Sequence, residues 1–196
     1  MVRKSAALLA AFVFSQVSAA DTAALSWEQP ADTIYAVDGS DAGTGTNFYS
    51  FSRLIKVSGG TGPIVTLNCQ AMSTGAHSLN VAIQMDPQNT YEEDPKERLR
   101  LLNINVALTV DGKRQFEKFM MHPKSTKIIP IDKAVGKRIY NAAVTGSSVS
   151  IKVQGSTYDL EIPDKDDAFI AFARICPTTN GGTFDNSIFE NVQAPT

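Results

Sequence analysis

The densest group of chemically active side chains lies in one polar stretch, in which acidic and basic residues are mixed. Asp86 is followed by Glu92, Glu93 and Asp94, and basic residues begin at Lys96. A pair of carboxylates can serve as the general acid and base in the hydrolysis of a sugar chain. One carboxyl group of such a pair needs burial to raise its pKa, and nothing in this stretch predicts burial. We therefore predict a solvated loop, with an acidic site as the alternative.

A glycine-rich run at residues 38–47 is a second candidate for chemistry. Asp38, Ser40 and Asp41 place oxygen atoms on a turning backbone, which is what calcium requires. The spacing does not match an EF-hand loop, which places a bidentate glutamate at its twelfth position. An ordinary glycine-rich loop is the prediction, and these three residues are a calcium candidate beside it. We expect no other metal site and no cofactor.

The chain contains two histidines, His77 and His122. No HExxH or other short histidine spacing is present, so a zinc site would need residues that converge from distant parts of the chain. A Ser-His-Asp triad also assembles in space, but no G-x-S-x-G sequence is present to suggest one. We expect both histidines on the surface or in loops, and we predict no catalytic residue.

An aromatic cluster precedes the first strong turn of the chain. Phe48, Tyr49 and Phe51 lie beside Arg53, and such a group could form a binding face for a sugar or a peptide. The alternative is a strand in which Tyr49, Phe51 and the following apolar residues face the core, with Arg53 as an exception to the alternation.

The N-terminus has the pattern of a secretory signal peptide. Arg3 and Lys4 precede an apolar stretch of about ten residues, and small residues follow up to Ala20. The apolar stretch is too short to span about 30 Å of hydrocarbon. We expect cleavage after Ala19 or Ala20 and no transmembrane anchor. The pattern is typical of bacteria, so we predict a periplasmic or secreted protein.

The two cysteines, Cys69 and Cys176, both follow the predicted signal peptide. In an oxidising compartment an even number of cysteines usually forms disulfides. A bond between these two would close a long loop, worth on the order of 4 kcal/mol in the chain-entropy treatment. Two buried free thiols are the alternative. A catalytic thiol is not expected, because neither cysteine has a histidine nearby in sequence and no CxxC is present.

The periodicity of apolar residues predicts mainly strands. Apolar and polar residues alternate most clearly at 65–69, 79–85 and 102–110, and Asp111-Gly112 predicts a hairpin after the last of these. The other expected strands lie at 48–57, 116–121, 128–131, 149–153 and 158–162.

Two segments change to helical spacing. Asp132 can cap a helix over 132–144, and Gly146 can end it. The last helix is expected to begin at Pro163-Asp164 and to bury Phe169 and Phe172. Because the strands follow one another without alternating helices, we predict an antiparallel β-sandwich of about seven to nine strands with two short helices, the last one C-terminal.

The expected organisation is one small domain. A net charge of −2 and a pI near 5.7 give no basic surface for nucleic acid, so we expect no nucleic-acid partner. The segments are a signal peptide at 1–20, a partly irregular N-terminal segment at 21–58, a β-sandwich core at 59–177 and a tail at 178–196.

The strand from Pro63 to Cys69, with its Leu67-Asn-Cys69 sequence, and the Ala168–Cys176 segment carry a family resemblance. They are similar to small periplasmic β-sandwich proteins of the invasion-associated locus B kind. They also resemble accessory periplasmic proteins of type VI secretion. The resemblance covers about residues 63–176, and the mid-chain cysteines of the locus B pattern are absent. It implies a non-enzymatic envelope protein with a Cys69–Cys176 disulfide.

We therefore predict a non-enzymatic binding or accessory role in an envelope or secretion-related assembly, with an envelope protein as partner. One alternative is a hydrolase or lectin that acts on cell-wall or surface polysaccharide, for which buried, paired carboxylates would argue. The other is a structural or adhesin-like surface subunit, for which an uncovered edge strand near 48–57 would argue.

Overall fold

The computed structural model describes residues 24–30, 32–37, 48–72, 77–89, 91 and 100–176. The predicted signal peptide and the 178–196 tail lie outside these residues. The elements in chain order are β1 (Ser26–Glu28), β2 (Thr33–Val37), β3 (Phe48–Ser58), β4 (Ile64–Met72), β5 (His77–Gln84), β6 (Leu102–Val110), β7 (Lys113–Met121), β8 (Lys127–Pro130), α1 (Lys133–Thr145), β9 (Val149–Val153), β10 (Ser156–Leu160) and α2 (Asp167–Ile175).

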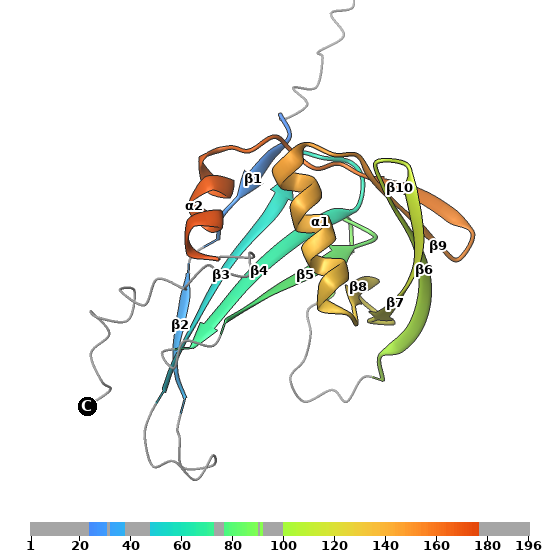
Figure 1. Cartoon of the computed structure of the whole chain (residues 1–196). Helices are drawn as coiled ribbons and strands as arrows, with labels where there is room; N and C mark the ends of the chain where they lie inside the picture. The colour runs from blue at the N-terminus through green and yellow to red at the C-terminus, as the bar shows by residue number, and fades with distance from the viewer. Residues whose placement is uncertain are drawn as a thin grey trace, which may run out of the picture.

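The fold is mainly β and antiparallel, with two helices of which the second is the last element described, as predicted. The described strands form one sheet in the order β1-β3-β4-β5-β8-β7-β6-β9-β10, and β2 pairs beside β3. The sheet curves around α1, so that β3, β4 and β5 lie on one side of the helix and β6, β7, β9 and β10 on the other (Figure 1). This gives two facing β layers from one continuous sheet.

All eight strands expected from alternation are present, and β1 and β2 are additional. Both additional strands lie in the 21–58 segment and pair along the same edge of β3. Trp27 of β1 is 4% exposed, and its ring lies 5.4 Å from that of Phe169 in α2. The described part of this segment is therefore built into the same core as the rest of the chain.

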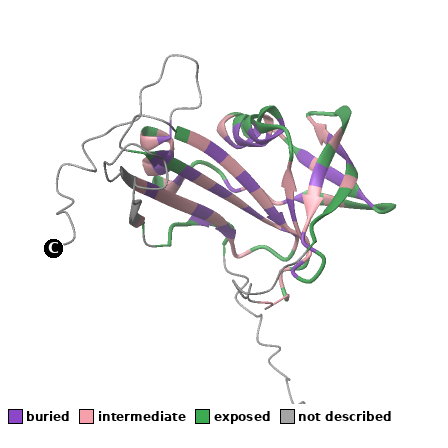
Figure 2. Cartoon of the chain, turned by 90° about the horizontal axis from the view of Figure 1, so that it is seen from below, coloured by how far each residue is buried: buried purple, intermediate pink, exposed green. Residues whose placement is uncertain are grey.

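The core lies between the concave face of the sheet and the two helices. Buried and less buried positions alternate along the strands (Figure 2), because successive side chains of a strand point to opposite faces. The largest fully buried side chains are Phe51, Phe119, Phe169, Phe172, Ile55, Leu67, Ile83, Leu108, Ile128, Ile139, Ile151 and Val65.

The limits of both helices follow from their capping residues. Asp132 caps α1 by accepting a hydrogen bond from the Ala134 N–H at 2.8 Å, and Gly146 ends the helix at a φ of 71°. Both residues were predicted in these roles. Helix α2 starts at Asp167, later than predicted, because Asp166 is its N-cap and Pro163 lies in the extended segment before it.

Cys69 of β4 and Cys176 lie at disulfide distance, which confirms the predicted pair. Their Sγ atoms are 2.25 Å apart and their Cα atoms 5.7 Å apart. Cys176 is the C-cap of α2, so the bond ties the end of that helix to a central strand. Among the described residues, no helix is long and apolar enough to cross a membrane.

Candidate functional site

The convex face of β3, β4, β5 and β8, which points away from α1, carries an open groove of about 560 Å³. The inward residues of these strands fill the core, so the groove is built mainly from the outward members of the alternating pattern, which are polar and aliphatic side chains. The lining residues are Leu54, Lys56, Thr66, Asn68, Gln70, Asn80, Val81, Ala82, Lys127 and Ile129.

Three amide side chains form the centre of the groove, and the sheet register fixes their positions. Asn68 and Asn80 are direct partners across β4 and β5. The Asn68 Oδ1 atom accepts a hydrogen bond from the Ser52 hydroxyl at 2.8 Å, and Asn80 Nδ2 donates to Gln70 Oε1 at 3.1 Å. An amide carries two N–H donors and an oxygen with two lone pairs, so these side chains keep unused bonding capacity. The centre of the groove is thus pre-positioned for hydrogen bonding.

Two lysines stand on the outermost strands of the groove, Lys56 on β3 and Lys127 on β8. Lys56 Nζ lies 3.3 Å from Glu28 Oε2, and both side chains are well exposed. An exposed ion pair of this kind contributes only about 0–1 kcal/mol, so a carboxylate from another molecule can compete for the lysine. Leu54 and Ile129 add aliphatic surface beside them.

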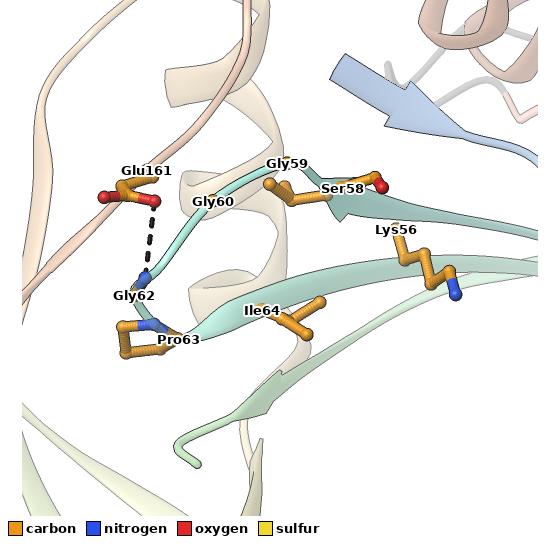
Figure 3. A pocket seen from close by; sticks show the side chains of 9 residues that line it. Lys56, Ser58, Gly59, Gly60, Gly62, Pro63, Ile64 and Glu161 are labelled. Atoms are coloured by element: carbon orange, nitrogen blue, oxygen red, sulfur yellow. Dashed lines mark hydrogen bonds between the residues drawn. The ribbon is translucent and has the colours of Figure 1, made fainter. Parts of the chain in front are cut away.

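A second small cavity, of about 140 Å³, lies beside the glycine-rich turn between β3 and β4. Figure 3 shows the Glu161 carboxylate directed at this turn. Glu161 Oε2 accepts hydrogen bonds from the Thr61 N–H at 2.9 Å and the Gly62 N–H at 3.3 Å. A Cβ atom at Gly60 would clash with the same carboxylate oxygen, so a larger residue there would displace the Glu161 carboxylate from the turn. This Gly60–Glu161 clasp joins the turn to the segment that precedes α2. The backbone N–H groups of the turn, which could bind an anion, are bonded to the Glu161 carboxylate instead.

The predicted aromatic binding face is only partly on the surface. Phe51 is 2% exposed and belongs to the core. Arg53 also faces inward, where its Nε donates to Asp32 Oδ1 at 2.8 Å and its guanidinium reaches the Ala171 carbonyl of α2 at 3.5 Å. The side chains of Phe48 and Tyr49 lie outside the described residues.

The predicted acidic site and the calcium candidate lie largely outside the described residues. Asp86 is exposed and its Oδ1 accepts a hydrogen bond from the Gln88 N–H at 3.0 Å, which is the bonding of a turn residue. Glu92, Glu93 and Asp94 are not among the described residues, and neither are the calcium candidates Asp38, Ser40 and Asp41. Within the described ranges, no three His, Cys, Asp or Glu side chains gather as a metal site would require.

The histidines occupy different environments. His77 is exposed at the start of β5, as expected. His122 lies in the loop that follows β7, as expected, but it is buried there, at 9% exposure. Its Nδ1 accepts a hydrogen bond from the Ser125 N–H at 3.0 Å, and its ring lies 5.4 Å from that of Tyr91. These contacts give His122 a structural role in the turn between β7 and β8.

The groove residues were not singled out in the sequence. The sequence does carry a signal for the groove. Over 66–70 and 78–84, the residues that alternate with the apolar ones are uncharged amides, hydroxyls and one alanine. Such residues are usual on the solvent face of a sheet, and only the pairing of β3, β4, β5 and β8 brings them into one groove.

No protein-family model, no curated protein and no solved structure matches this chain. The resemblance to locus B and type VI accessory proteins therefore stays a prediction, and function is argued from the geometry of the groove.

Proposed function

We propose that this chain is an exported, non-enzymatic binding domain that holds an acidic protein partner of the cell envelope in the groove between β3 and β8. The observation that carries this proposal is the set of amide side chains fixed on paired strands, with a lysine on each bordering strand. A surface whose hydrogen-bonding groups are already in place loses little entropy on binding.

The mixed composition of the groove favours a protein over a small ligand or a sugar. Protein interfaces combine aliphatic contacts with adaptable polar groups, as Leu54, Ile129 and the amides do here. Pockets for small ligands enclose most of the ligand's surface, whereas this groove is open to solvent. None of the residues lining this groove is aromatic.

The lysines specify the charge of the partner. Lys56 and Lys127 are three strand spacings apart across the sheet and two residues apart along it, which gives a separation of roughly 16 Å. A partner that presents carboxylates at about this separation would match both ends of the groove while its uncharged surface meets the amides.

Export to the periplasm or beyond rests on the N-terminal pattern and on the cysteine pair. The basic residues, the short apolar stretch and the small residues up to Ala20 are those of a signal peptide. A cysteine pair at disulfide distance suits an oxidising compartment.

The adhesin-like alternative depended on a free edge near 48–57. In the structure β2 pairs with β3 from Val37↔Phe48 to Thr33↔Ser52, and β1 covers Lys56–Ser58. The described part of this edge is therefore largely occupied, and it offers little room for strand addition.

Site-specific photo-crosslinking in the native envelope tests the proposal. A crosslinker at Asn68, in the centre of the groove, should capture one acidic protein, and the capture should fall at high salt. A crosslinker at Asn141, exposed on α1, is the matched control and should not capture it. Equal capture from both positions would contradict a specific groove. Retention on purified wall polysaccharide without any protein crosslink would support the lectin alternative instead.

A further inference from the structure

The other half of the sheet presents a different surface, on the convex side of β7, β6 and β9. Phe116 of β7 is 75% exposed there, far more than any other large apolar side chain in the described part of the chain. The Arg114 guanidinium carbon lies 5.0 Å from the centre of the Phe116 ring. A cation at this distance over an aromatic face is attracted to it, so the two side chains form one amphipathic group.

The strand register places two more cations on the same face. Arg114, Phe116 and Lys118 alternate along β7, so all three point outward. Phe116 pairs with Ala107 on β6, and Ala107 pairs with Lys152 on β9. Arg114 and Lys118 are thus separated by roughly 13 Å along the strand, and Phe116 and Lys152 by roughly 10 Å across the sheet.

This Phe116 face, defined by Arg114, Phe116, Lys118 and Lys152, is locally cationic although the chain carries a net charge of −2. Among the described strand residues that share this outward side, the acidic one is Asp159 on the edge strand β10. Glu117, which lies between Phe116 and Lys118, points inward and pairs with Arg138 of α1 at 2.7 Å.

We propose that the Phe116 face rests on the surface of an anionic phospholipid bilayer. Aromatic rings settle at the level of the lipid headgroups, and basic side chains beside them attract anionic lipids. The face holds one aromatic ring and three cations on adjacent strands, which is the arrangement that such contact requires. The inference is independent of the groove, which lies on other strands.

The small size of the face favours a bilayer over a protein. Four residues along each of three strands cover roughly 200 Å². A stable protein interface needs about 800 Å² per partner with matched shape. A bilayer needs no matched shape, and each Lys or Arg near an anionic leaflet strengthens attachment about fivefold.

Co-sedimentation with lipid vesicles tests this proposal. The protein is used in the form recovered from cells, with its N-terminus determined by mass spectrometry. Vesicles of mixed phosphatidylcholine and phosphatidylglycerol should bind it at low salt, and pure phosphatidylcholine should bind it weakly. Phe116→Ala should lower the partition coefficient about tenfold. Arg114→Glu and Lys118→Glu should each lower it at least about fivefold.

Lys137→Glu is the matched control, because Lys137 is exposed on α1 and the charge change is the same. It should leave vesicle binding unchanged, while thermal unfolding confirms that every variant is folded. The proposal is overturned if the unmutated protein ignores the anionic vesicles, or if Lys137→Glu weakens binding as much as Lys118→Glu. It is also overturned if soluble polyglutamate binds the Phe116 face and the vesicles do not.

Discussion

The two halves of the one sheet differ in what they present outward and in how they are held. The half made by β3, β4 and β5 shows amides and hydroxyls, with side chains bonded to one another across the strands. The half made by β7, β6 and β9 shows an exposed ring among cations. The first half is fastened to α2 by the disulfide and to the segment before α2 by the Gly60–Glu161 clasp.

This difference suggests that the two halves bind by different physics. Fixed amides can discriminate between partners by hydrogen-bond geometry, which requires a rigid support. A ring among cations depends on charge and on removal of apolar surface from water, and it tolerates a fluid partner. The elements that fasten the first half can therefore be broken one at a time, to show whether they support the groove without altering the Phe116 face.

The largest effect is expected from removal of the disulfide. Replacing Cys69 and Cys176 together by alanine should lower the free energy of unfolding by about 4 kcal/mol, because the unfolded chain regains a loop of 107 residues. Urea unfolding measures the loss. Adding a reductant to the unmutated protein should have a similar effect and should leave the double variant unchanged. A loss below about 1 kcal/mol would show that the bond contributes little.

The clasp should give the next largest effect. Gly60→Ala places a Cβ atom against the Glu161 carboxylate and should cost about 1–3 kcal/mol. In the Glu161→Ala background the same substitution should cost clearly less, because the clashing group is gone. Thermal or urea unfolding of the unmutated protein, the two single variants and the double variant completes the double-mutant cycle. Additive losses would mean that the clasp does not couple these residues.

A smaller loss is expected at the start of α2. The Asp166 carboxylate accepts hydrogen bonds from the Phe169 N–H at 2.9 Å and from the Trp27 N–H at 2.7 Å. Asp166→Ala should therefore cost about 1–2 kcal/mol, and it should loosen β1 together with the helix. Asp164→Ala, at an exposed position two residues earlier, is the control and should change stability by less than about 0.5 kcal/mol. Hydrogen exchange of the Trp27 amide would show whether the two elements are coupled.

The smallest effect on stability is expected at the Phe116 face. Phe116→Ala removes a ring that is 75% exposed, so the free energy of unfolding should change by no more than about 0.5 kcal/mol. Partner capture from Asn68 should also be unchanged. A stability loss of several kcal/mol would show instead that Phe116 is a packing residue.

The fold was predictable where local chemistry determines it. The alternation in β4, β5 and β6 and the caps of α1 act over a few residues, so they are visible in the sequence. Strand β1 was not predicted, because three residues are too few to show a period. Its position depends on the burial of Trp27 against Phe169 and on the hydrogen bond to Asp166, which are long-range contacts.

The candidate site was less predictable than the fold. Asn68 and Asn80 look like ordinary outward residues until the register makes them neighbours. Phe116 was predicted on a strand over 116–121, and the pairing with Ala107 decides that it points outward. Arg53 breaks the alternation of β3 because its guanidinium bonds to Asp32 and to the Ala171 carbonyl in the middle of α2.

The affinity of the captured partner for groove variants tests the central claim most directly. Lys56→Glu with Lys127→Glu should weaken binding at least about tenfold and reduce its dependence on salt, since both ends of the groove would then repel the partner's carboxylates. Lys137→Glu with Lys165→Glu makes the same charge change at exposed positions that do not line the groove and should leave the affinity unchanged. Equal affinities for the two double variants would contradict the assignment of the groove as the binding site.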